Sequence, residues 1–496
     1  TMVPLPTGDG DQQRRAHSAL RRRMLQGNWQ QDLEARVRAF FPPTTVARFG
    51  NLDLSRNVFR SVTKSLSQLY SYRPTVSHSD MTDEQSDEFA RQLGIAGAWP
   101  LLAQNQVLTV GLRESLVRLD YLDSSESGRA LIRLVPADTV YCEASADSPD
   151  EPNLVIEARV RMIKDKTGRS SKVWTWDVLD LRDPEEPSYR VVLPNDDLDV
   201  DSTEADITEQ VLGGTFTGQD YPYRVDGAPV IPYVLYHRQR INQLWDPYAG
   251  RELVDATLQV GALYSLWGYL VRDASHPLRY LAGAKIRGTQ QRGSGSSSRQ
   301  EVHVDPTAIL QLIPDGGSPV QAGQWNAGAD PERLQLAIQS FEVSAAAHGG
   351  LQPDDLQRTG GPESGVALAL KREAVREHQR MMVPEFERGD QAVLSRVASL
   401  LNTYTGTSYP ESGYRIRYPG LPLSPQERAI RLQEARDEIA LGVASLVDVV
   451  LAKNPGWTRE EAQAHLDLIG RERRMFPAET YERLAAKRLT SELTNL

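Results

Sequence analysis

Apolar residues recur every three or four positions in several long segments of the chain. One such series predicts a helix over residues 54–70, because this spacing places the residues on one helical face. An Arg-Pro pair at 73–74 ends it, since proline disfavours the helical conformation of the preceding residue. Further helices are expected before residue 54 and over 88–119, interrupted by Trp-Pro at 99–100. The apolar series is Leu54, Val58, Val62, Leu66 and Leu69.

Between about 130 and 190 the pattern changes to short β-branched and aromatic runs separated by turn residues. Such runs are typical of antiparallel strands, and residues 166–169 have the composition of a hairpin turn. An acidic stretch follows at 196–209. It lacks the glycine and the final glutamate of an EF-hand loop, which favours a solvated surface over a calcium site.

Residues 253–271 predict a helix that is apolar on almost every side. Such a helix must be covered all round, by its own chain or by neighbouring subunits. The segment is too short and too mixed for a membrane span. A His-Pro pair at 276–277 ends the helix, and a glycine- and serine-rich segment at 288–298 predicts a flexible, exposed loop. From residue 279 to 299 the only charged side chains are basic.

Three helical segments follow. The first, over 331–347, has a capping aspartate, a proline and a glutamate at its start (330–332). The second is a long helix over 363–404, in which an internal proline predicts a kink. The tail, 425–496, is helical and nearly charge-balanced, with a turn at 454–456. The apolar stripe of the long helix is Leu370, Ala374, Met381, Val393, Val397, Leu400 and Leu401.

Composition narrows the class of protein. With 496 residues, of which 40% are hydrophobic and 25% charged, the chain is a folded protein with more than one core or one elongated subunit. Its net charge of −10 gives no bulk attraction to DNA. The single cysteine, Cys142, forms no disulfide within the chain and is expected to be a buried thiol, which fits assembly in a reducing cytoplasm. No secretory signal is expected.

Five arginines cluster in the first helical segment. Such a cluster can bind nucleic acid, but on a helix with leucines nearby it more often forms a solvated face, and that interpretation is preferred. The five are Arg14, Arg15, Arg21, Arg22 and Arg23.

Motifs that carry chemistry are missing from the sequence. There is no phosphate-binding Gly-Lys-Ser/Thr loop and no His-Glu-x-x-His, and the eight histidines are scattered singly. The spacing around Ser364 differs from that of a serine nucleophile elbow, so Ser364 is interpreted as the start of a helix. We therefore predict no catalytic residue, no metal and no cofactor. The remaining enzyme alternative is an unrecognised site, such as that of a polysaccharide hydrolase.

An ordered series of segments resembles the portal proteins of tailed bacteriophages. The helix at 57–66 before the Tyr-Arg-Pro turn resembles an early portal helix, and Ser-Gly-Val-Ala-Leu at 364–368 resembles the start of the long portal helix. Between these two segments lie counterparts of two stem helices. The clip would follow the first stem helix, and the tunnel loop would follow the second. The order of segments carries the resemblance, since no single motif is diagnostic.

The resemblance implies an α+β fold, mainly α, in an elongated subunit with long helices, a β-rich wing part, a small α/β clip and a helical crown. The implied parts are a wing (1–249, with its β region at about 130–190), a stem helix (250–274), the clip (275–330), a second stem helix (331–348), the tunnel loop (349–362), the long kinked helix with the return to the wing (363–424), and the crown (425–496).

Portal proteins form closed rings, commonly dodecamers, at the capsid vertex. The resemblance therefore implies a virion protein, assembled in the host cytoplasm, whose channel passes double-stranded DNA during packaging and ejection. The implied partners are the terminase large subunit, which carries the ATPase, a head-completion adaptor, and the major capsid and scaffolding proteins. No enzyme activity and no membrane are expected. The alternative class is another virion structural protein, of the minor head or of tail assembly.

The resemblance also assigns roles to particular residues. The tunnel loop would face DNA through Leu351, Gln352, Asp354, Asp355, Gln357 and Arg358, between the hinges Gly349, Gly350, Gly360 and Gly361. The clip would bind partners through Lys285, Arg287, Arg292 and Arg299. Subunit contacts would involve Leu258, Leu263, Leu266 and Trp267, and Pro384 would kink the long helix.

Overall fold

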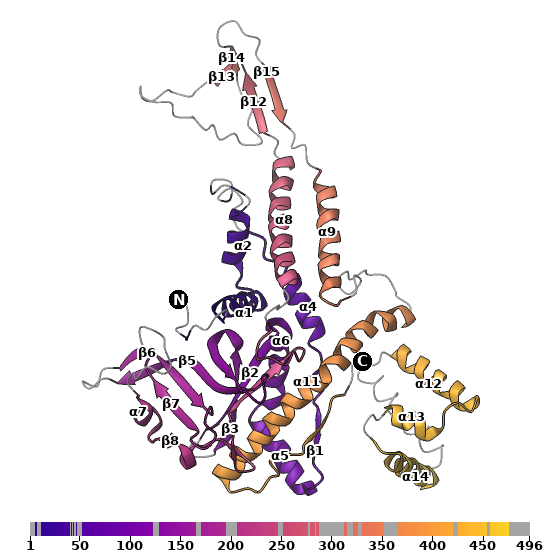
Figure 1. Cartoon of the computed structure of the whole chain (residues 1–496). Helices are drawn as coiled ribbons and strands as arrows, with labels where there is room; N and C mark the ends of the chain where they lie inside the picture. The colour runs from indigo at the N-terminus through magenta and orange to yellow at the C-terminus, as the bar shows by residue number, and fades with distance from the viewer. Residues whose placement is uncertain are drawn as a thin grey trace, which may run out of the picture. The chain divides into compact units, whose positions relative to one another are not determined.

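The computed structural model divides the chain into two compact units, one of residues 1–361 with 371–421 and one of residues 362–370 with 422–496. Figure 1 shows the elements of both. The division of the chain into wing, stem, clip and crown stays a prediction. The structure describes residues 5–6, 11–39, 41, 43, 46, 52–122, 128–164, 170–194, 206–246, 251–275, 278–282, 284–286, 312–314, 321–325, 330–351, 365–419, 425–453 and 457–475.

The first unit begins with short helices. These are α1 (Asp11–Gln26), α2 (Gln30–Arg38) and α4 (Val58–Leu66). The helix predicted over 54–70 is therefore present but shorter. It starts where the side chain of Asn57 accepts a hydrogen bond from the backbone N–H of Arg60 at 2.8 Å, which satisfies a free donor of the first turn.

One sequence prediction is wrong in the next segment. The helix expected over 88–119 is two helices and a strand, namely α5 (Asp83–Ile95), α6 (Ala98–Leu112) and β2 (Glu114–Leu122). Arg113 adopts a positive φ of 79° between α6 and β2. Residues 114–119 are all buried, so β2 lacks the alternation of apolar and polar residues that marks a half-buried strand.

The β region is confirmed as two antiparallel sheets. One has the order β11-β2-β3 and the other β4-β5-β6-β7-β8. Residues 166–169, predicted as a turn, lie outside the described residues, but the strands on either side pair, with Lys164 opposite Ser170. The strands are β3 (Arg129–Pro136), β4 (Val140–Ala144), β5 (Pro152–Lys164), β6 (Ser170–Asp180), β7 (Ser188–Val192), β8 (Phe216–Thr217) and β11 (Tyr233–His237).

The end of the acidic stretch starts a short helix. Asp206 accepts a hydrogen bond from the backbone N–H of Thr208 at 2.8 Å, and α7 (Thr208–Leu212) follows. The strands β9 (Arg224–Val225) and β10 (Ala228–Pro229) then form a small hairpin. The rest of the acidic stretch, 196–205, lies outside the described residues.

The predicted apolar helix is α8 (Arg251–Ser275), and the predicted capped helix is α9 (Pro331–His348). They pack side by side (Figure 1). Apart from Asp330, which caps α9, the described residues between them are all in strands, so the helical part expected of the clip has no counterpart among them. These strands pair as β12 (Leu278–Ala282) with β15 (Gln321–Trp325) and β13 (Ala284–Ile286) with β14 (Leu312–Pro314).

The long helix is α11 (Gly365–Thr405), and it continues through Pro384. Its C-terminal half buries Val393, Val397, Leu400 and Leu401, as the stripe predicts. Met381 is 68% exposed, so its assignment to the stripe is wrong, and the adjacent Met382 is buried instead. Leu370 and Ala374 are among the positions whose side chains are not described. After α11, β16 (Arg415–Arg417) pairs with β1 (Thr75–Ser77).

The second unit is mainly helical where it is described, which confirms the helical prediction for the tail over 425–475; residues 476–496 lie outside the described residues. It contains α12 (Pro425–Ala440), α13 (Leu446–Lys453) and α14 (Arg459–Met475). The predicted turn at 454–456 lies outside the described residues.

Candidate functional site

The pair of helices α8 and α9 is fixed to the rest of the first unit by polar contacts that are buried or partly buried. The hydroxyl of Thr257 accepts a hydrogen bond from the backbone N–H of Phe59, and that of Ser265 accepts one from Asp53, both at 3.0 Å. Trp267 donates its indole N–H to the carbonyl oxygen of Pro331 at 3.0 Å, which joins the end of α8 to the start of α9. The cap predicted at Asp330 is present, accepting from the backbone N–H of residue 332 at 3.0 Å.

The four residues predicted at subunit contacts differ in exposure. Leu258 is only 7% exposed and packs with Trp29 and Leu33 of its own chain, so its assignment to a contact between subunits is wrong. Helix α2 covers this side of α8. Because the two helices are far apart in the sequence, no local pattern predicts this contact. Leu263, Leu266 and Trp267 are partly buried and keep some exposed surface.

The most exposed large apolar side chains on this helix pair are on α9. Leu336 is 65% exposed and Phe341 is 41% exposed. The sequence reasoning missed both. A signal was available for Leu336, because the helical period places it on the side opposite the buried Ile338, whereas Phe341 lies at the edge of the buried face.

The first glycine pair of the predicted tunnel loop forms a fixed helix end. Gly350 has a φ of +96°, and its N–H donates to the carbonyl oxygen of Ala347 at 3.0 Å. The N–H of Leu351 donates to Ala346 at 3.0 Å, which completes a Schellman motif, and the Leu351 side chain is buried. A Cβ on Gly350 would lie 2.5 Å from Nε2 of His378.

A Cβ on the neighbouring Gly349 would lie 2.8 Å from a methyl carbon of Val62. Hydrogen bonds and close packing hold this end of the loop in the structure, and the role of Gly349 and Gly350 as hinges stays a prediction. Leu351, which was predicted to face DNA with the rest of the loop, is buried in this structure. The remaining loop predictions, Gln352, Asp354, Asp355, Gln357, Arg358, Gly360 and Gly361, lie outside the described residues.

The predicted clip residues are only partly placed. Lys285 lies in β13 opposite Ile313 of β14, in a segment whose side chains are not described. Arg287, Arg292 and Arg299 lie outside the described residues. Their proposed contact with partner proteins stays a prediction, as does the kink at Pro384.

The arginines of α1 do not form a solvated face, so that interpretation is wrong. Arg14 donates to the carbonyl oxygen of Ala137 at 2.9 Å, and Arg15, which is buried, donates to that of Pro6 at 2.9 Å. The guanidinium group reaches distant carbonyl oxygens while its aliphatic stem packs, which composition alone does not reveal. Ion pairs hold two more of these arginines, Arg22 to Asp138 at 2.7 Å and Arg23 to Asp32 at 2.6 Å.

The single thiol is buried, as predicted. Burial raises the pKa of Cys142 to about 12, so the sulfur stays protonated and is a poor nucleophile.

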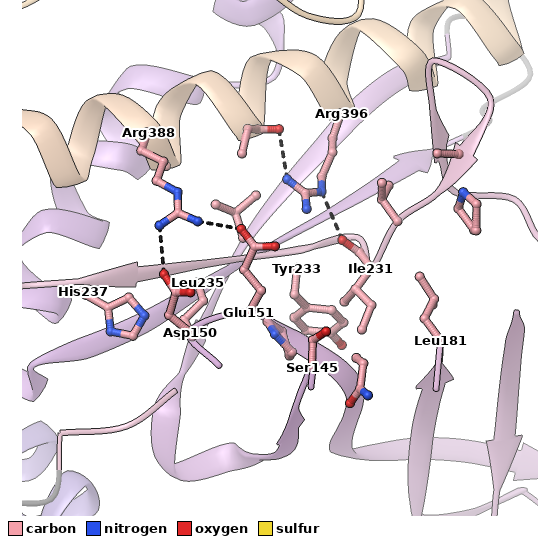
Figure 2. Close-up of a pocket in the computed structure, with 18 of the residues that line it drawn as sticks. Ser145, Asp150, Glu151, Leu181, Ile231, Tyr233, Leu235, His237, Arg388 and Arg396 are labelled. Carbon is pink, nitrogen blue, oxygen red and sulfur yellow. Dashed lines mark hydrogen bonds and ion pairs between the residues drawn. The ribbon is translucent and has the colours of Figure 1, made fainter. Parts of the chain in front are cut away.

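A pocket of about 430 Å³ lies between α11 and the sheets. Figure 2 shows Arg388 between two carboxylates, with 2.9 Å to Asp150 and 2.6 Å to Glu151. Arg396 donates to the carbonyl oxygens of Ile231 at 3.0 Å and Ala392 at 3.3 Å. The cations of this pocket are thus bonded to groups of the chain itself, an arrangement that fastens α11 to the sheets.

Two further classes of site have no support in the described part of the chain. No group of three or more His, Cys, Asp or Glu side chains there is arranged to hold a metal ion. None of its helices is both long enough and apolar enough for a membrane span.

Comparison with known proteins adds little information about function to what the structure of the chain indicates. No protein-family model matches the chain, and no curated protein does. Among solved structures, the chain is similar to a chain in the virion of a native gene transfer agent particle, with 13% sequence identity and a TM-score of 0.40. That similarity covers 86% of this chain and 99% of the other. At this level of similarity, the function has to be argued from the residues themselves.

Proposed function

We propose that the chain is one subunit of a portal-type ring in the virion of a tailed phage or a related particle, with a central channel for double-stranded DNA. The observation that carries the proposal is the apolar surface left uncovered on the α8–α9 pair, with Leu336 and Phe341 exposed on α9. Large exposed apolar groups on a well-packed helix pair are typical of an interface with another chain.

A closed ring accounts for the way the two helices differ. In a ring each contact is heterologous, so one face of a subunit meets a different face of its neighbour. On α8, Val254 and Leu258 are buried against the N-terminal helices of the same chain. The side chains of α9 are covered on one face and exposed on the other. The exposed face of α9 would therefore pack against the next copy.

The net charge supports a passage for DNA rather than a clamp. A ring of subunits that each carry a net charge of −10 would bind few phosphates tightly, so the duplex could slide. In this proposal the ring, commonly a dodecamer, stands at the capsid vertex and is not an enzyme. It docks the terminase large subunit during packaging and a head-completion adaptor afterwards, and it contacts the major capsid and scaffolding proteins.

Electron microscopy of the purified full chain, with mass photometry of the same sample, tests the proposal. We expect annular particles with a central hole. Leu336→Asp should abolish them, because each subunit contact would bury an unpaired carboxylate at a cost of several kcal/mol. Ile95→Asp is the matched control, since Ile95 is also an exposed aliphatic residue, at the end of α5.

The control should assemble like the unchanged chain. A chain that remains monomeric, or that forms assemblies without a channel, would contradict the portal proposal and favour another virion structural role. Rings that survive Leu336→Asp would show that α9 does not form the subunit contact.

A further inference from the structure

A second pocket, of about 450 Å³, lies where α1, α4, the start of α8 and the end of α9 meet. Its apolar wall includes Val62 and Leu66 of α4. Its polar lining includes three arginines, Arg21, Arg113 and Arg238, from three separate segments of the first unit, together with Thr63, Glu252 and His348. No sequence motif brings these three arginines together.

Arg21 is buried without full use of its hydrogen-bond donors. Only 2% of the residue is exposed. One guanidinium nitrogen, Nη1, donates to the carbonyl oxygen of Leu112 at 3.4 Å, and the other, Nη2, has no hydrogen-bond partner in the described part of the chain. Burial lowers the pKa of Arg21 to about 10, which shows how poorly the pocket compensates its charge.

Arg238 carries a second charge, which the nearby Asp246 compensates only in part. Its backbone N–H donates to the carbonyl oxygen of Arg113 at 2.8 Å, but its guanidinium makes no hydrogen bond or ion pair with any residue described here. Burial and the nearby Arg113 lower the pKa of Arg238 to about 10. Arg113 is itself bonded to Asp246, with 3.0 Å from Nε to Oδ2.

The carboxylates around the pocket do not balance these charges. Asp246 is bonded to Arg113. Glu114 is buried and accepts the backbone N–H of Asp246 at 2.7 Å, and burial raises its pKa to about 7, so it is only partly ionised at neutral pH. Glu252, at the start of α8, is exposed to solvent. The pocket thus holds more positive than negative charge.

The backbone dipoles of two helix ends at the pocket mouth also affect the binding of an anion. Residues of the first turn of the 25-residue helix α8 line the pocket, and the N-terminal end of a helix attracts anions. The C-terminal end of α9 lies there too and would repel them. The carbonyl oxygens of Ala345, Ala346 and Ala347 already accept hydrogen bonds in the cap of α9, which weakens that repulsion.

We propose that this pocket binds a phosphate group between Arg21 and Arg238. Guanidinium groups recognise the oxygens of phosphate through paired N–H donors, and a multiply charged anion would offset both incompletely compensated cations. The phosphate comes either from a free anion or from the backbone of a nucleic acid. The site is independent of ring formation, because it is built within the first unit of one chain.

Calorimetric titration of the full chain with inorganic phosphate, at matched ionic strength, tests the proposal. We expect saturable binding that Arg238→Gln weakens by about tenfold or more, since a charge-assisted contact is lost. Arg240→Gln is the matched control. Arg240 lies two positions away and pairs with Asp150 at 2.7 Å, outside this pocket, so phosphate affinity should stay unchanged.

Thermal unfolding separates loss of the site from loss of the fold. Phosphate should raise the unfolding temperature of the unchanged chain and of Arg240→Gln, but not of Arg238→Gln. Without phosphate, Arg238→Gln should unfold at the same or a higher temperature than the unchanged chain, because a repulsive charge has been removed. Unfolding of this variant at a lower temperature in phosphate-free buffer would contradict the proposal.

A short DNA duplex identifies the source of the phosphate. DNA binding that Arg238→Gln weakens and free phosphate competes with would assign the site to the nucleic-acid backbone. Phosphate binding without DNA binding would assign it to a free anion. The proposal fails if the chain shows no saturable binding of either probe, or if Arg240→Gln loses as much affinity as Arg238→Gln. Ring formation, scored by microscopy, is a separate outcome.

Discussion

Asp177 and Asp390 are both completely buried, but the chain neutralises only one of them with cations. Asp177, on β6, lies 2.6 Å from Nη1 of Arg118 and also pairs with Arg159 and Arg161. Asp390, on α11, has only tyrosine hydroxyl groups around its carboxylate among the contacts that the structure describes. The two sites show how the same side chain can have opposite effects on stability.

Arg118 joins the two sheets. It extends from β2 in the three-stranded sheet and pairs with Glu157 of β5 at 3.1 Å as well as with Asp177. Burial alone would raise the pKa of Asp177, but Arg118 and Arg161 hold it well below its usual range. The carboxylate therefore stays ionised in the folded protein.

Asp390 joins α11 to three other segments. It accepts hydrogen bonds from the hydroxyl groups of Tyr70 at 2.7 Å, Tyr236 at 2.8 Å and Tyr418 at 2.6 Å. Burial raises the pKa of Asp390 to about 6, and the three hydroxyl groups limit the rise. The folded protein therefore holds a proton here more readily than the unfolded chain does.

The two sites respond to pH in opposite directions. Because the pKa of Asp177 is lowered in the folded state, its contribution to stability is present above its unfolded pKa, about 4, and is lost as the pH falls. Because the pKa of Asp390 is raised, its contribution is greatest in acid and is lost as the pH rises from about 4 to about 6. Charge compensation, rather than burial, decides whether the contribution of a buried carboxylate to stability rises or falls with pH.

The largest effect is expected from Arg118→Met. It would leave Asp177 buried without its main cation and remove one of two cations from Glu157, and loss of one partner of a buried ion pair costs about 3–5 kcal/mol. Urea-induced unfolding of the first unit, within the full chain at neutral pH, measures the change in the free energy of unfolding. Arg182→Met is the control, because Arg182 pairs with Asp180 at the surface of the same sheet and should cost less than about 1 kcal/mol. Equal losses of stability in the two variants would refute the distinction between the buried and the surface ion pairs.

A smaller, pH-dependent effect is expected from Asp390→Asn. The unchanged chain should lose about 2 kcal/mol relative to this variant between about pH 4 and about pH 8, since only the carboxylate releases a proton. Urea unfolding across that range, compared with Asp177→Asn, measures it. The Asp177 variant should differ most from the unchanged chain at neutral pH and least in acid. A stability gap between Asp390→Asn and the unchanged chain that does not vary with pH would contradict the assignment.

Local patterns in the sequence predicted the elements that depend on neighbouring residues. The cap at Asp330, the apolar helix α8 and the hairpin of β5 and β6 are examples. The strand β2 was missed because it is buried on both faces and so shows no alternation. Met381 was assigned to the buried stripe, but Met382 is buried instead, because a shift of one position along the helix decides between burial and exposure.

The candidate sites depended on contacts that no local pattern encodes. Tyr70 and Asp390 meet across 320 positions of sequence, and Arg118 meets Tyr233 across 115. The arginines that line the phosphate pocket are likewise brought together only by the fold. Predictions for the clip and the tunnel loop came from a family resemblance, and most of those residues lie outside the described part of the chain.

The smallest effects are expected from two tyrosines of one strand. Tyr233 and Tyr236 of β11 differ by three positions and so point to opposite faces, where Tyr233 donates to Glu157 at 2.6 Å and Tyr236 to Asp390. Replacing either with Phe should cost about 1–2 kcal/mol at pH 7. The loss in Tyr236→Phe should be larger at pH 8 than at pH 5, because the hydroxyl stabilises ionised Asp390. The loss in Tyr233→Phe should be equal at both, since Arg133 and Arg118 lower the pKa of the buried Glu157 even though burial alone would raise it. Urea unfolding at the two pH values measures both losses, and the same pH response in both variants would mean that Asp390 does not titrate between pH 5 and pH 8.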